Sequence, residues 1–197
     1  MRIGKLLLVI AAFIIAAVLA SCGGSQGEGQ ATSSNDVQAP TPTTSSGQQA
    51  QQNNCPKDKT LKITVPSMSR LNNSPVPDTS GDDEDALKNH VGIHLQGTGF
   101  PCQNGSNVYI AGHRLGYPAT PSWLAFWDLN KPKEGDMIYL EDANGAQYNY
   151  KIYKIFEVAP TDLSVTDPVQ GKSVVSLQSC TLPDYSNRLI VQGELQA

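Results

Sequence analysis

Two runs of alternating apolar and polar residues, one on each side of an Asn-Gly pair, constrain the fold of this chain most strongly. Residues 137–140 and 147–158 both alternate with a period close to two, and Asn144-Gly145 lies between them. That period places successive side chains on opposite faces of a strand, and Asn-Gly suits a tight two-residue turn. The sequence therefore predicts a β-hairpin.

Other short runs of strand-like residues fill most of the region after residue 57. They occupy residues 61–65, 91–95, 107–111, 174–178 and 189–195, and glycine, proline and asparagine separate them. Helical patterns are sparse. Residues 83–89 and 122–129 each predict a short helix, and we expect at least two of Trp123, Phe126 and Trp127 in the core. Many short strands predict an all-β fold, either a closed barrel or a sandwich.

The first 22 residues have the pattern of a bacterial secretory signal. Arg2 and Lys5 precede an uninterrupted apolar stretch over residues 6–20, which is shorter than the roughly 18 residues of a membrane span. The stretch ends in Leu-Ala-Ser-Cys, which is the lipobox pattern, so Cys22 is the predicted lipidation site. The alternative is an uncleaved signal anchor. Either form predicts an exported protein held at the extracytoplasmic face of a membrane.

Residues 23–56 are rich in Gly, Ser, Thr, Gln and Asn and contain almost no apolar side chains. Such a segment cannot bury enough surface to offset the entropy of ordering its backbone, so we predict a disordered tether. Residues 57–197 are enough for one domain with its own core. The formal net charge of the chain is −4 and its basic residues are not clustered, so nucleic acid is not an expected partner.

One cysteine in the folded region follows a strand-like run, and a histidine follows another. Cys180 follows the run at residues 174–178, His113 comes shortly after residues 107–111, and Arg188 immediately precedes the last run. A thiol can attack a carbonyl carbon, an imidazole can move the protons, and a guanidinium can stabilise the oxyanion. These three residues are therefore candidates for acyl transfer through a thioester.

The segments around these residues resemble motifs of the sortases, the cysteine transpeptidases of bacterial cell surfaces. The similar segments are GTGFP at 97–101, NVYIAGHR at 107–114, GDMI at 135–138, SLQSC at 176–180 and RLIV at 188–191. Ser176 and Ser179 stand where the family commonly has threonine. The chain looks closest to the class D, E and F sortases of Gram-positive bacteria.

The resemblance implies an eight-stranded β-barrel with one or two short helices. It implies that Cys180 is the nucleophile, that His113 is the acid–base and that Arg188 binds the substrate backbone and the oxyanion. Ser179 is a further candidate for a hydrogen bond to the substrate. The implied substrates are exported proteins with a C-terminal LPxTG-like sorting signal, cleaved between Thr and Gly. The implied acceptor is an amine of the cell wall or of a pilin.

The four cysteines of the chain suggest one disulfide. With Cys22 assigned to a lipid and Cys180 to chemistry, Cys55 and Cys102 remain, and exported thiols tend to oxidise. We therefore predict a Cys55–Cys102 disulfide, against the alternative of two unpaired thiols. The acidic run at residues 82–85 lacks the alternating spacing of a calcium loop and precedes a helix, so we interpret it as an N-terminal cap. We expect neither a metal ion nor a cofactor.

Two other functions fit the same residues. The first is a lipoprotein binding module on a sortase-like barrel that has lost activity. The second is an envelope hydrolase that uses Cys180, His113 and Arg188 with water as the acceptor.

Overall fold

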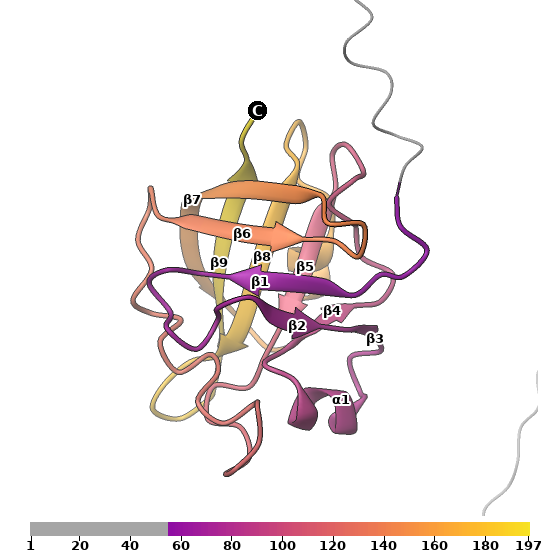
Figure 1. Ribbon diagram of the computed structural model, residues 1–197. Coiled ribbons are helices and arrows are strands. Elements are labelled where there is room, and N and C mark those ends of the chain that lie inside the picture. The colour runs from indigo at the N-terminus through magenta and orange to yellow at the C-terminus, as the bar shows by residue number, and fades with distance from the viewer. Residues whose placement is uncertain (1–54) are drawn as a thin grey trace, which may run out of the picture. The chain divides into compact units, whose positions relative to one another are not determined.

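The computed structural model describes residues 55–197, and the predicted signal segment, with Cys22, and nearly all of the predicted tether lie outside the described residues. A 9-stranded sheet dominates this part of the chain (Figure 1). The strands are β1 (Leu61–Thr64), β2 (Ser74–Val76), β3 (Asp78–Thr79), β4 (Ile93–Leu95), β5 (Asn107–Ala111), β6 (Met137–Glu141), β7 (Gln147–Val158), β8 (Val174–Cys180) and β9 (Arg188–Leu195). The prediction of an all-β fold is confirmed.

The order of the strands in the sheet makes it a nearly closed barrel. That order is β2-β1-β6-β7-β9-β8-β5-β4-β3, so β2 and β3 are the two edges. Only Pro77 separates these two strands along the chain, which brings the edges of the sheet together. A barrel protects edge strands from pairing with other chains. The resemblance implied eight strands, and the ninth is the two-residue strand β3.

The predicted hairpin is formed by β6 and β7, which pair antiparallel from Met137↔Lys151 to Glu141↔Gln147. The alternation within β7 shifts by one residue near Tyr153. At the same place the register with β9 jumps from Ile152↔Gly193 to Lys154↔Gln192, which marks a β-bulge. An extra residue in one strand reverses the side on which the following side chains point.

One predicted helix is confirmed and the other is wrong. Helix α1 (Glu84–Asn89) begins after Asp83, whose side chain accepts a hydrogen bond from the backbone N–H of Ala86. Residues 121–130 form successive turns instead, because Leu124 has a left-handed φ of 59° that an α-helix cannot contain. A short 3-10 helix, η1 (Leu163–Thr166), lies in the segment between β7 and β8. Neither α1 nor η1 has the length and apolar character needed to cross a bilayer.

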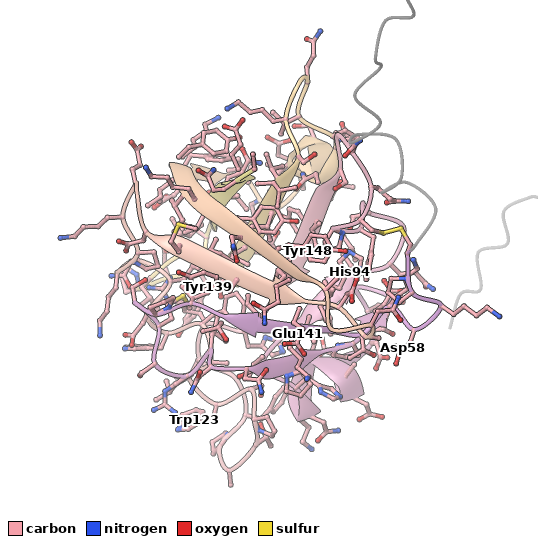
Figure 2. All side chains as sticks on the ribbon, turned by 45° about the horizontal axis from the view of Figure 1, so that its top comes forward. Asp58, His94, Trp123, Tyr139, Glu141 and Tyr148 are labelled. Carbon is pink, nitrogen blue, oxygen red and sulfur yellow. A yellow bond between two sulfur atoms is a disulfide. The ribbon has the colours of Figure 1, made fainter. Side chains whose placement is uncertain are left out.

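The core of the barrel is built from the inward-facing side chains of the strands. It includes Leu61, Ile63, Val108, Ile110, Ile138, Leu140, Tyr150, Ile152, Val175, Leu177 and Val191. From the turns at 121–130, Phe126 is fully buried, whereas Trp127 is exposed and Trp123 is partly buried. Figure 2 shows Trp123 at the end of the barrel, away from β6 and β7. The expectation of two aromatic core residues from this segment is therefore wrong.

A disulfide joins Cys55 to Cys102, the pairing expected from the sequence (Figure 2). It ties the segment before β1 to the loop between β4 and β5, across a sequence separation of 47 residues. Cross-linking a loop of that length restricts the unfolded chain, and the chain-entropy model gives a stabilisation of at most about 4 kcal/mol.

We predict that Cys55→Ser/Cys102→Ser lowers the free energy of unfolding by up to about 4 kcal/mol, because the unfolded chain regains its loop entropy. Denaturant unfolding of the variant and of the wild type, each with and without reductant, measures the effect. Reductant should lower the midpoint of the wild type and leave that of the variant unchanged. Equal wild-type midpoints with and without reductant would contradict the prediction.

Candidate active site

Parallel pairing of β5 with β8 brings His113 and Cys180 to the same end of the barrel. The pairing runs from Asn107↔Val174 to Ala111↔Gln178, and it continues in the hydrogen bond of 3.1 Å from the Gly112 N–H to the Gln178 carbonyl. Both strands point to the same end of the barrel (Figure 1). Since parallel strands end at the same edge, His113 lies beyond β5 beside Cys180, the last residue of β8.

Antiparallel pairing of β8 with β9 adds Arg188 to the same place. Cys180 and Arg188 are directly opposite each other in the register. Residues facing each other in this way place their side chains on the same face of the sheet. The Arg188 guanidinium donates from Nη1 to the carbonyls of Tyr185, at 3.5 Å, and Asn187, at 3.3 Å.

The three side chains lie on the outer face of the barrel. Val175 and Leu177 of β8 point into the core, so Ser176, Gln178 and Cys180 point the other way. The candidate nucleophile therefore faces away from the core. Cys180 is partly buried and is the free cysteine of the described part of the chain.

Ser179 was expected to contact the substrate, but its side chain lies on the opposite face from Cys180. It is 1% exposed, and its hydroxyl donates to the Gly112 carbonyl at 2.8 Å. This bond ties the end of β8 to the residue that precedes His113. We therefore propose that the Ser179 hydroxyl positions the two strand ends, while Ser179, which is among the residues lining the pocket beside Cys180, stays a candidate for a substrate contact.

A pocket of about 410 Å³ opens beside the three residues. Its floor is the outer face of β5, β8 and β9, and one wall comes from α1 and β4. The opposite wall is the segment between β7 and β8, which contains η1. The residues that line it away from Cys180, His113 and Arg188 are largely apolar and include Leu87, Ile93, Leu95, Leu163 and Val165. This lining favours apolar groups of a ligand.

Buried polar residues under the η1 segment hold that wall in place. The Asn107 side-chain amide donates to the carbonyls of Val165 and Asp167, both at 2.9 Å. Its oxygen accepts from the Ser176 hydroxyl at 2.8 Å, and that hydroxyl accepts from Gln192 at 2.9 Å. Because each of these buried groups has partners, the network fixes the segment without leaving an unpaired polar atom there.

Two further polar side chains, Tyr109 and Arg114, lie near the site. Tyr109 lines the pocket and donates to Gln178 Oε1 at 2.6 Å, and burial raises the pKa of its phenol. Arg114 is 3% exposed, and its Nη2 donates to Asn130 at 2.7 Å. Burial lowers the pKa of Arg114, and the nearby acidic groups, Cys180 among them, oppose that shift. A buried cation thus lies within electrostatic reach of the thiol.

Within residues 55–197 no group of three His, Cys, Asp or Glu side chains is placed to hold a metal ion. The site instead combines a thiol, an imidazole and a guanidinium on one face of a β-barrel. These are the parts of a thiol-dependent acyl-transfer site.

Comparison with known proteins agrees with this description. The family model of the sortase domain matches residues 63–196. Sortase A of Streptococcus agalactiae serotype III (strain NEM316) is 36% identical over 91 residues, which are 46% of this chain and 36% of that protein. Sortase A of Staphylococcus aureus (strain NCTC 8325 / PS 47) is 33% identical over 97 residues, which are 47% of this chain and 45% of that protein.

A solved structure of Streptococcus pneumoniae sortase C superposes with a TM-score of 0.58 and 26% identity, over 68% of this chain and 64% of that one. The chain belongs to the sortase family. The matched regions span less than half the length of either sortase A.

Gly112 allows the close packing that sets the position of His113. A Cβ at Gly112 would lie 2.4 Å from two ring atoms of Phe126 and 2.8 Å from the Val91 carbonyl oxygen. The same phenylalanine donates its backbone N–H to the His113 carbonyl at 3.4 Å. A side chain at position 112 would therefore push the segment that carries His113.

We predict that Gly112→Ala costs about 1–3 kcal/mol of stability through overpacking and also slows alkylation of Cys180 by moving His113. Thermal unfolding and the rate of Cys180 alkylation measure the two effects. Gly145→Ala is the control, since Gly145 has a φ of 81°, lies outside the pocket and has no atom within 4 Å of its built Cβ. It should lose stability through backbone strain and keep the wild-type alkylation rate. A wild-type rate in Gly112→Ala would refute the prediction.

Proposed function

We propose that this protein is a sortase-type cysteine transpeptidase that cleaves exported proteins at a C-terminal sorting signal. The observation that carries the proposal is the register that sets Cys180 opposite Arg188 on the face where β5 delivers His113. Family membership supports the reaction class. The proposed signal is LPxTG-like, with cleavage between Thr and Gly.

The first half of the proposed reaction acylates the enzyme. His113 takes the proton of the Cys180 thiol, and the thiolate attacks the threonine carbonyl carbon to form a C–S bond. Arg188 donates to the oxyanion of the tetrahedral intermediate. The C–N bond then breaks, and His113 returns the proton to the leaving glycine amine. The product is a thioester on Cys180.

The second half transfers the acyl group to an amine. The incoming amine attacks the thioester carbon, His113 accepts its proton, and the C–S bond breaks to release the Cys180 thiolate, which recovers a proton from His113. The proposed acceptors are an amine of the cell wall or of a pilin. A pilin acceptor is included because the Streptococcus pneumoniae sortase C that superposes on this chain has a specificity for pilin substrates.

The proposed location is the extracytoplasmic face of the membrane, with a lipid on Cys22 or an uncleaved signal as the anchor. The Cys55–Cys102 disulfide supports export, because disulfides persist in oxidising compartments.

The apolar side chains lining the pocket support a peptide substrate that buries leucine and proline side chains beside Cys180.

The direct test mixes the full chain with a panel of Leu-x-x-Thr-Gly peptides and follows its intact mass with and without hydroxylamine. We expect an acyl adduct that maps to Cys180 and that hydroxylamine removes. Cys180→Ala should form no adduct and should unfold at nearly the wild-type temperature. A Cys22→Ser background removes the remaining cysteine outside the Cys55–Cys102 disulfide, so that any adduct has one possible site. An equal adduct in Cys180→Ala would overturn the proposal.

Adding an amine such as triglycine to the same reaction distinguishes transfer from hydrolysis. An amide-linked product is the expected result for a transpeptidase. A free threonine carboxylate as the main product, at saturating amine, would identify a hydrolase. A Cys180 thiol that resists alkylation at neutral pH would instead identify a binding module.

Arg188 gives a second prediction, because a guanidinium offers a planar fork of donors to a carbonyl oxygen and an ammonium does not. We expect Arg188→Ala to lower kcat about 10²–10³-fold, as the loss of an oxyanion donor does elsewhere. Arg188→Lys keeps the charge and should recover only a small part of the loss. Steady-state kinetics on the best peptide measures both, and full activity in Arg188→Lys would show that charge alone suffices.

A further inference from the structure

The nitrogen Nε2 of His113 faces an acidic side chain that the proposed reaction does not use. It is buried and has no hydrogen-bond partner within the described residues. A Glu84 carboxylate oxygen lies 3.8 Å from it. The imidazole as a whole keeps 31% of its surface exposed and lines the pocket. Nδ1 is the other ring nitrogen through which the imidazole can exchange protons.

The position of Glu84 is set by α1. Asp83 caps the helix, which leaves Glu84 in its first turn free to face His113. On the same helix, Leu87 is buried against the pocket and anchors α1 to the barrel. From the sequence the acidic run was interpreted only as a helix cap. In the structure Asp83 caps α1, and Glu84 faces the His113 imidazole.

Tyr117 holds the carboxylate and the imidazole together. Its hydroxyl donates to Glu84 Oε2 at 3.2 Å, and its ring packs edge-on against His113 with 5.5 Å between ring centroids. The Lys88 ammonium lies 5.8 Å from the Tyr117 ring centroid. The Ser122 hydroxyl, which is buried, accepts from the Tyr117 backbone N–H at 3.2 Å and fixes this loop.

We propose that Glu84, oriented by Tyr117, is a positioning residue for His113. A carboxylate beside Nε2 favours the tautomer that carries its hydrogen there, which leaves the Nδ1 lone pair to take the Cys180 proton. When Nδ1 has taken that proton, the carboxylate also stabilises the resulting imidazolium. This is the role of the third group that orients the base beside a nucleophile. The inference rests on the proposed function, since it assigns His113 as the acid–base.

The contribution to folding is expected to be small, and this separates positioning from structure. Glu84 is 66% exposed, and exposed ion pairs contribute little to stability. Glu84→Gln should therefore unfold within a degree or two of the wild type. Asp85→Asn is the matched control, because it removes one negative charge from the same turn of α1 and Asp85 is exposed.

The test measures iodoacetamide alkylation of Cys180 in the full chain at neutral pH, located by peptide mass. We expect Glu84→Gln to slow alkylation about fivefold, the upper end of what an exposed charge pair contributes. Asp85→Asn should keep the wild-type rate, and Glu84→Asp should keep part of it. Tyr117→Phe should slow alkylation too, and Glu84→Gln/Tyr117→Phe should be no slower than the slower single variant.

With a peptide substrate, Glu84→Gln should lower kcat and leave KM unchanged, because Glu84 contacts His113 and does not line the pocket. Equal alkylation rates in Glu84→Gln and Asp85→Asn would overturn the inference, as would a much lower unfolding temperature in Glu84→Gln alone. If Glu84→Gln is alkylated more slowly but the wild type transfers no peptide, the positioning role is upheld and the proposed function is rejected. If the wild type transfers the peptide but Glu84→Gln is alkylated at the wild-type rate, the proposed function is upheld and the positioning role is rejected.

Discussion

The parallel contact between β5 and β8 is the constraint on which the site depends. It joins segments that lie far apart in sequence, and the Ser179 hydroxyl bond to the Gly112 carbonyl secures its last step across 67 positions. A slip of one residue would turn Cys180 into the core and Ser179 outward, since side chains alternate along a strand. The apolar side chains of Val108, Ile110, Val175 and Leu177 oppose such a slip, because it would expose them. The hydrophobic core thus fixes the strand register that keeps Cys180 on the outer face.

The pocket lies on the outer face of the same two strands, β5 and β8. Burial on both faces of β5 and β8 requires a cover, and the segment with η1 supplies it. The Asn107 side chain, on β5, donates to two carbonyls of that segment. A strand of the pocket floor therefore holds the pocket wall in place. A polar residue inside a strand is costly unless its partners are complete. Here its partners also shape the space in which a substrate would lie.

The sequence was sufficient where the local pattern and the final fold agree. The period of two predicted β5 and β7 with their observed bounds, because both alternate and end at turn residues. It missed β2 and β3, because Pro75 and the neighbouring Pro77 obscure the strand pattern of these short edge strands, which pair with β1 and β4. It predicted a helix at 122–129 from composition, whereas Leu124 takes a left-handed conformation held by its backbone bond to Leu115. The orientation of Ser179 could have been predicted from its place next to Cys180 on a strand. The contact between Glu84 and His113 could not, because it depends on where α1 packs.

The charges around the site follow a consistent arrangement. The thiol has the Arg188 guanidinium opposite it in the register and the buried Arg114 within electrostatic reach. The imidazole has the Glu84 carboxylate 3.8 Å from its Nε2. In the proposed reaction a thiolate and an imidazolium form together, and cations near the sulfur with an anion near the imidazole suit that transient pair. These charged groups come from three separate parts of the fold: β9, α1 and the loop after β5.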